Sequence, residues 1–122
     1  MRKPIYSLQT ISYEYENGKL SVELFNEIIS GFTPDVWDYM MLSPNEPIDN
    51  CTCIQFSSFD DGTCDFRYRL EAYFGSTDDN TWKVYRSPSS DKSIAIQHFI
   101  EFWKEQKIPD ISSWEDVTDE IG

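Results

Sequence analysis

The stretch DNCTCIQFSSFDDGTCDFRYRLEAYF, residues 49–74, decides the fold because two strand patterns flank a turn signal. We place Gly62 in the left-handed position of a three-residue loop, Asp60–Gly62, which pairs Phe56 with Phe66. One face of the hairpin then collects the apolar side chains, whereas a register change of one residue would scatter them over both faces. The predicted apolar face is Ile54, Phe56, Phe66, Tyr68, Leu70, Ala72 and Phe74.

A third strand follows this hairpin. The segment TWKVYRS, residues 81–87, alternates apolar and polar side chains after the acidic loop GSTDDN. Three consecutive antiparallel strands form a meander, which has enough strands to be stable. We therefore predict an antiparallel sheet built around residues 52–87.

Residues 5–24 predict another hairpin. Asn17-Gly18 is a strong signal for a two-residue turn, and alternation on both sides sets Tyr15 opposite Leu20. A helix over residues 19–30 is the rival interpretation, since Leu20, Leu24 and Ile28 also have helical spacing. We favour the hairpin, with FNEIISG as a short helix after it.

Two further segments read as helices. Thr33 can cap a short helix near residues 34–42, and Pro34 suits its first turn. A longer amphipathic helix is predicted from about residue 91 to 107, and Pro109 ends it. Its apolar face is Ala95, Ile96, Phe99, Ile100, Phe102 and Trp103. The predicted fold class is therefore α+β: an antiparallel sheet, made of a hairpin plus a three-stranded meander, packed against the C-terminal helix and the short helix.

The chain has 122 residues, the usual size of one domain. We expect a single domain over residues 1–122 with an acidic C-terminal tail over 108–122. Eight Phe, seven Tyr and four Trp residues can fill a core of this size and leave aromatic side chains for an interface.

The charge is strongly acidic. Twenty-two Asp and Glu against ten Lys and Arg give a formal charge of −12. This argues against nucleic acid and anionic membranes as partners and favours a cationic protein. The N-terminal segment lacks the apolar core of a signal peptide, and we expect a cytoplasmic protein.

The three cysteines do not predict a metal site. Cys51 and Cys53 are predicted to share one face of a strand, and a fourth thiol for structural zinc is missing. We expect half-buried free thiols. The carboxylates of DDGTCDFRYRLE resemble a calcium loop, yet the strand alternation explains them better. We expect no metal and no cofactor.

No catalytic signature occurs in the sequence. His98, the only histidine, lies near Glu101 and Glu105 on the predicted polar face of the helix. A solvated surface explains it better than acid–base catalysis, because no nucleophile or oxyanion donor accompanies it. We expect no enzyme activity and assign no catalytic residue.

Acidic and aromatic residues occur together at several places, including Asp35, Trp37, Asp38 and Tyr39. Aromatic side chains anchor interfaces and carboxylates attract Arg and Lys, although both also occur in cores and on solvated surfaces. The residues predicted to contact a partner are Asp60, Asp61, Asp78, Asp79, Trp82, Trp114, Glu115, Asp116, Asp119 and Glu120.

The small size, the acidity, the sheet-plus-helix layout and the tail SSWEDVTDEI resemble immunity proteins of bacterial toxin–immunity systems, such as contact-dependent growth inhibition. This resemblance implies a tight complex with one cognate toxin domain, often a basic nuclease, whose active site an acidic surface would block. Two alternatives stay open. One is a small ligand-binding or enzymatic domain with a cavity between the sheet and the C-terminal helix, where His98 or Tyr68 would matter. The other is an adaptor that adds a strand to a partner sheet.

Overall fold

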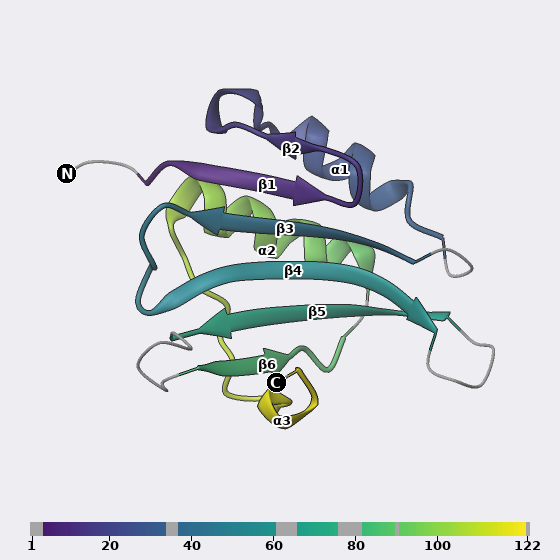
Figure 1. Ribbon diagram of the computed structural model, residues 1–122, viewed down its shortest axis with the longest axis vertical. Helices are drawn as coiled ribbons and strands as arrows, with labels where there is room; N and C mark the ends of the chain where they lie inside the picture. Colours follow the sequence, from purple (N-terminus) through teal and green to yellow (C-terminus); the bar gives the residue numbers. More distant parts are fainter. Residues whose placement is uncertain (1–3, 34–36, 61–65, 76–81, 90, 122) are drawn as a thin grey trace.

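A computed structural model of the chain describes residues 4–33, 37–60, 66–75, 82–89 and 91–121, and for residues 59, 60, 66, 67, 120 and 121 it describes the backbone alone. The fold is α+β, with one antiparallel sheet and two main helices (Figure 1). None of the helices within these ranges is long and apolar enough to cross a membrane.

Within the described residues, the sheet has seven strands in the order β2-β1-β3-β4-β5-β6-β7, and each neighbouring pair is antiparallel. Its centre is the predicted meander, which is confirmed as three strands consecutive in sequence and in space. The strands are β1 Tyr6–Thr10, β2 Glu14–Tyr15, β3 Asp38–Pro44, β4 Cys51–Asp60, β5 Phe66–Phe74, β6 Lys83–Arg86 and β7 Glu115–Asp116.

Both main helices, α1 (Val22–Ser30) and α2 (Lys92–Glu105), lie on the same side of the sheet (Figure 1). The predicted C-terminal helix is confirmed, and Ala95, Phe99 and Phe102 are its fully buried residues. Phe25 of α1 packs against the ring of Phe99, with 6.1 Å between centroids, and edge-on against Trp103 at 5.4 Å. The core therefore lies between the two helices and one face of the sheet.

The predicted hairpin around Asn17-Gly18 is wrong. Asn17–Lys19 form a short 3-10 helix, η1, and the rival helix is present as α1. The side chain of Ser21 caps α1 by accepting a hydrogen bond from the backbone N–H of Leu24. Phe25 and Ile29 are buried on one side of α1, and Phe25 packs against Phe99 of α2. The spacing of the apolar residues allowed either a strand or a helix, and this packing decides for the helix.

The predicted short helix near residues 34–42 is also wrong in its described part, because residues 38–44 form β3. Met40 and Leu42 are buried in the core, while Tyr39 and Met41 lie on the opposite face. Both faces of this strand carry large apolar side chains, so the sequence does not show the polar–apolar alternation that indicates a strand.

The pairing of β4 with β5 differs from the prediction by four residues, since Phe56 lies opposite Leu70 and not Phe66. The displacement is an even number, so the side chains of residues 53–58 and 68–74 keep their predicted faces, whereas a bulge beside Cys51 changes the face of that residue. Asp60 ends β4 and Phe66 begins β5, and the rest of the predicted turn lies outside the described residues.

Candidate functional site

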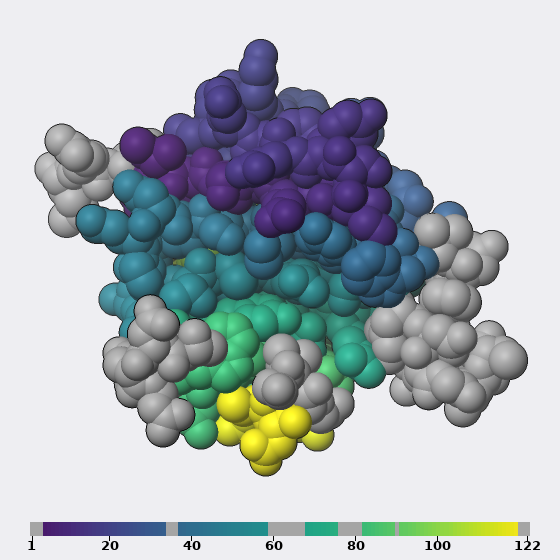
Figure 2. Space-filling model, viewed as in Figure 1, coloured from purple at the N-terminus to yellow at the C-terminus, as the bar shows by residue number. Residues whose placement is uncertain are grey.

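No helix of the described residues covers the sheet face that points away from α1 and α2 (Figure 1). In the space-filling view this face forms one surface from β1 to the C-terminal segment, with α2 almost hidden behind it (Figure 2). We call it the uncovered face. Strand alternation and cross-strand pairing place on it Gln9, Tyr39, Met41, Gln55, Ser57, Arg69, Glu71, Tyr73 and Arg86.

The centre of the uncovered face holds an ion pair between adjacent strands. Glu71 lies directly opposite Arg86, and the carboxylate oxygen Oε2 accepts hydrogen bonds from Nε and Nη2 of the arginine, over 3.0 and 2.9 Å. The side chains are only 4% and 16% exposed. Removing either partner would leave a buried charge, so we assign the pair a structural role.

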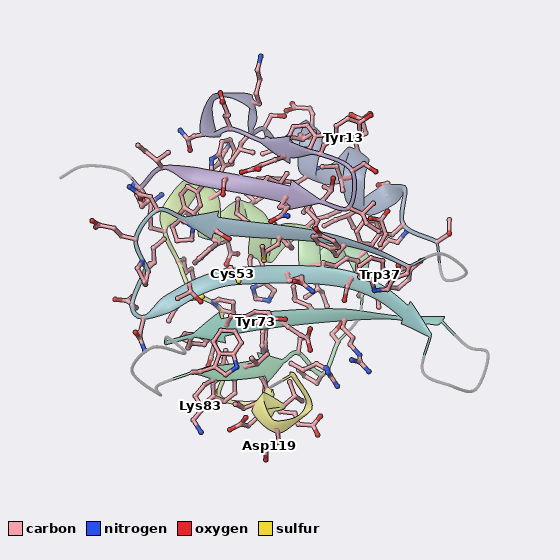
Figure 3. All side chains as sticks on the ribbon, in the orientation of Figure 1. Tyr13, Trp37, Cys53, Tyr73, Lys83 and Asp119 are labelled. Atoms are coloured by element: carbon pink, nitrogen blue, oxygen red, sulfur yellow. The ribbon has the colours of Figure 1, made fainter. Side chains whose placement is uncertain are left out.

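Aromatic pairs occupy the two ends of the uncovered face. Trp37 lies 5.6 Å from the ring of Tyr39 at the end where β3 begins, and 56% of its surface is exposed. Tyr73 contacts Trp82 at 5.3 Å near the opposite end (Figure 3). Trp37 is exposed and the other three rings are partly buried, and aromatic side chains at a surface can serve as anchors in protein interfaces.

Three of the predicted contact acids are described and lie together at the β6 edge of the sheet. Glu115 and Asp116 form β7, which pairs with β6, and Asp119 lies in α3 (Thr118–Ile121). All three are exposed, and Asp119 projects outward from the lower rim of the uncovered face in Figure 3. Trp82 directly precedes β6, so the structure brings this predicted aromatic anchor to the same side of the sheet.

Asp116 already has intramolecular partners. Its Oδ1 accepts hydrogen bonds from the backbone N–H and the hydroxyl of Thr118, over 3.0 and 2.5 Å, and its Oδ2 lies 4.0 Å from Nζ of Lys83. The hydrogen bonds from Thr118 lower the pKa of this carboxyl. Asp116 therefore holds the start of α3, and Glu115 and Asp119 remain as the stronger candidates for contact with a partner.

Trp114 packs against the hydrophobic core and meets His98 edge-on, at 5.7 Å between ring centroids. His98 is half-buried and not on a solvated surface as predicted, and burial lowers its pKa. The Trp114 ring thus fastens the C-terminal tail to α2. The remaining predicted contact residues lie outside the described side chains: Asp60, Asp61, Asp78, Asp79 and Glu120.

Two of the cysteines are buried free thiols. A bulge between Cys51 and Cys53 turns Cys51 into the core, whereas Cys53 lies beside Tyr73 on the uncovered face, so the prediction of one shared face is wrong (Figure 3). Burial raises the pKa of each thiol to about 12, which makes both poor nucleophiles. Within the described ranges, no three His, Cys, Asp or Glu side chains gather in a way that could hold a metal ion.

Next to both edge strands of the sheet, β2 and β7, side chains of the chain itself bond backbone donors of β1 and β6. Beside β2, the Oδ1 of Asn17 accepts a hydrogen bond from the backbone N–H of Tyr6, over 3.0 Å. Beside β7, the hydroxyl of Thr118 accepts one from the N–H of Val84, over 3.0 Å. These side chains take up backbone donors that an added strand would need, which disfavours the adaptor interpretation.

The space between α2 and the sheet is filled by core side chains. Tyr6, Phe99 and Phe102 are almost fully buried there, and the Tyr6 hydroxyl donates a hydrogen bond to the backbone carbonyl of Phe102. Tyr68 donates to the carbonyl of Phe32 and stacks on Phe56. A surface hollow of about 430 Å³ does lie beside the C-terminal end of α2, where Trp103, Lys104 and Gln106 line it together with Pro4, Tyr6 and Asn17.

Comparisons with known protein families, with curated protein sequences and with solved structures find no match to this chain. Functional interpretation therefore depends on the residues themselves. Sequence reasoning missed the Glu71–Arg86 pair, because identifying it required the register of β5 against β6. It noted Trp37 and Tyr39 as an acidic–aromatic group but did not select them as contact residues.

Proposed function

We propose that this chain is an immunity-type inhibitor that binds one basic bacterial toxin domain, most simply a nuclease, and neutralises it by covering its active site. The observation that carries the proposal is that Glu115 and Asp119 are exposed at the same edge of the sheet that carries the aromatic pair Tyr73–Trp82. Exposed carboxylates attract Arg and Lys, and aromatic rings bury apolar surface on contact. The combination is suited to docking on a positively charged protein.

The overall charge supports the same partner class. A formal charge of −12 attracts a basic domain over distance and speeds its association. The active-site cleft of a nuclease is positively charged because it binds phosphates, so an acidic surface is complementary to it. In this proposal the chain blocks access and catalyses no reaction, and the complex buries about 1,200–2,000 Å² in total.

A cavity between the sheet and α2 was the basis of the ligand-binding alternative. Phe99, Phe102 and Tyr6 occupy that space, so this alternative has less support than docking. We place the complex in the cytoplasm, where a reducing environment suits the unpaired thiols of Cys51 and Cys53.

Affinity capture followed by genetics tests the proposal. The tagged chain is used to capture proteins from the source organism, and each captured protein is then expressed alone and together with the chain. We expect one basic protein that stops growth when expressed alone and is tolerated when the chain is present. Capture of proteins that are harmless alone, or whose toxicity the chain does not relieve, contradicts the proposal.

Charge-reversal variants test the proposed contact. Glu115→Lys combined with Asp119→Lys is expected to abolish rescue, because like charges then face each other across the interface. Glu105→Lys is the control for a charge reversal elsewhere on the surface, since Glu105 is also exposed but lies at the C-terminal end of α2. Equal rescue by the double variant and the control would exclude the C-terminal rim as the contact.

A further inference from the structure

A second hollow, of about 230 Å³, lies between the β1–β2 turn and the C-terminal end of α1. Its described walls include Ile11 and Tyr13 of the turn, Tyr15 of β2, and Ile28 and Gly31 at the end of α1, with Asp38 of β3. It is smaller than the sites that hold drug-sized ligands, which are about 300–1,000 Å³. A hollow of this size suits one side chain of a partner protein.

Apolar side chains remain exposed beside this hollow. Ile11 is 49% and Tyr13 is 68% exposed, although both belong to a tight turn where polar residues are usual. The turn is fixed by hydrogen bonds from the backbone N–H of Thr10 to the carbonyl of Tyr13, over 2.8 Å, and from the N–H of Tyr13 to the Thr10 hydroxyl, over 3.1 Å. The apolar surface is therefore held in place before any partner arrives, which lowers the entropy cost of binding.

The electrostatics of the hollow favour a cation. Asp38 contributes the one formal charge among the described lining residues, and it makes no ion pair within the described part of the chain. The negative end of the α1 dipole already has a cation, because Nζ of Lys92 donates to the carbonyls of Ser30 and Phe32. The attraction for a further cation therefore comes from the carboxylate of Asp38.

We propose that this hollow receives an arginine side chain of the basic partner. The aliphatic part of the arginine would pack on Ile11 and Ile28, and the planar guanidinium would stack on a tyrosine ring and pair with the Asp38 carboxylate. Tyr13 and Tyr15, with ring centroids 6.2 Å apart, supply the aromatic wall. The inference rests on the proposed function. It names an arginine as the side chain that the partner inserts near β2, at the edge of the sheet opposite to β7 and the proposed C-terminal contact.

N-acetyl-arginine amide is the probe, and its neutral analogue N-acetyl-citrulline amide is the control. Two-dimensional amide NMR of the whole chain follows the titration of each compound. We expect saturable shifts at residues 11–15, 28, 31 and 38 with the arginine probe, a dissociation constant of about 1 mM, and no such shifts with citrulline. Shifts that do not saturate, or that appear equally at all exposed acids, overturn the inference.

Two variants separate the hollow from general acidity. Asp38→Asn preserves the acceptor that bonds the backbone N–H of Tyr39, so the fold is kept while the charge is lost. It is expected to weaken binding of the arginine probe about tenfold, whereas Glu105→Gln, which also removes one charge, leaves it unchanged. Equal affinity of Asp38→Asn and Glu105→Gln overturns the inference.

The outcome for the hollow is distinguishable from the outcome for the proposed function. If the probe does not bind but the chain still neutralises a basic toxin, the hollow is not the contact and the function stands. If the probe binds at the hollow but no toxic partner is captured, the proposed function fails while the arginine site stands.

Discussion

Arg86 donates from both Nε and Nη2 to a single carboxylate oxygen of Glu71, directly across β6 and β5 on the uncovered face of the sheet. The pair is nearly inaccessible to solvent although it lies on the outer side of the sheet. This ion pair adds to the backbone pairing that joins β6 to β5, and β6 in turn pairs with β7, which carries Glu115.

Breaking this pair should destabilise the protein strongly. Arg86→Met leaves the buried Glu71 carboxylate without its cation, and we expect a loss of about 3–5 kcal/mol in the free energy of unfolding. The double variant Glu71→Leu with Arg86→Met removes both charges and should recover much of the loss. Urea titration measures both variants.

The control for this experiment is Lys83→Gln on the same strand. Lys83 is exposed, and its ion pair with Asp116 spans 4.0 Å, so we expect no measurable change. A single Arg86 variant as stable as the Lys83 control would show that the pair does not hold the edge of the sheet.

The core between α2 and the sheet should be sensitive to truncation at Phe99. This ring is fully buried and packs on Phe25, so Phe99→Ala is expected to cost about 3–5 kcal/mol through lost contacts and a residual cavity. Ile94→Ala, on the exposed side of the same helix, should stay within about 0.5 kcal/mol of the parent. Similar denaturation midpoints for the two variants would contradict the assignment of the helix face.

Gly18→Ala distinguishes the observed structure from the hairpin predicted for the same residues. A two-residue turn at Asn17-Gly18 needs positive φ at the glycine, where alanine is strained. In the structure Gly18 lies in η1, no atom lies within 4 Å of an added Cβ, and its φ is not in the left-handed region. We therefore expect Gly18→Ala to stabilise the protein by about 0.4–1 kcal/mol, measured by thermal or urea unfolding, and marked destabilisation would favour the hairpin.

Stability should depend on His98 at mildly acidic pH. Burial lowers the pKa of His98 below its ordinary value of 6.5, so the folded state binds the proton less well than the unfolded state. The contribution of the neutral ring is present above pH 6.5 and is lost as the pH falls from there toward the folded pKa. His98→Gln should therefore lose less stability than the parent between about pH 7.5 and about pH 5.5, and an equal loss in both proteins would contradict the burial of this ring.

Much of the fold follows from local patterns, and the errors have identifiable causes. The meander and α2 were predicted correctly from the alternation in residues 66–74 and the apolar face of residues 95–103. The first pattern fits only the two-residue repeat of a strand, and the second fits only the repeat of a helix. Leu20, Leu24 and Ile28 fit two interpretations, and only the contact of Phe25 with α2 decides between them. Both faces of β3 carry apolar side chains, so its sequence lacks the polar–apolar alternation that indicates a strand.

The candidate site was less accessible from the sequence than the fold. Glu115 and Asp119 could be selected by their charge, but their position at the same sheet edge as Trp82 depends on the pairing of β7 with β6, which is non-local. The hollow at Asp38 joins residues from β1, β2, α1 and β3, so no single segment indicates it. Trp114 was selected as an anchor for a partner, yet in the structure its ring packs within the chain.

The rate of association between this chain and the toxin domain that it captures tests the central claim most directly. Stopped-flow fluorescence, with the Trp residues as reporters, gives this rate over a range of salt concentrations. If docking is led by the acidic surface, the rate falls at least about tenfold between about 0.05 and 0.5 M salt and is further reduced by Glu115→Lys with Asp119→Lys. A rate that is independent of salt and of these charges would contradict the account.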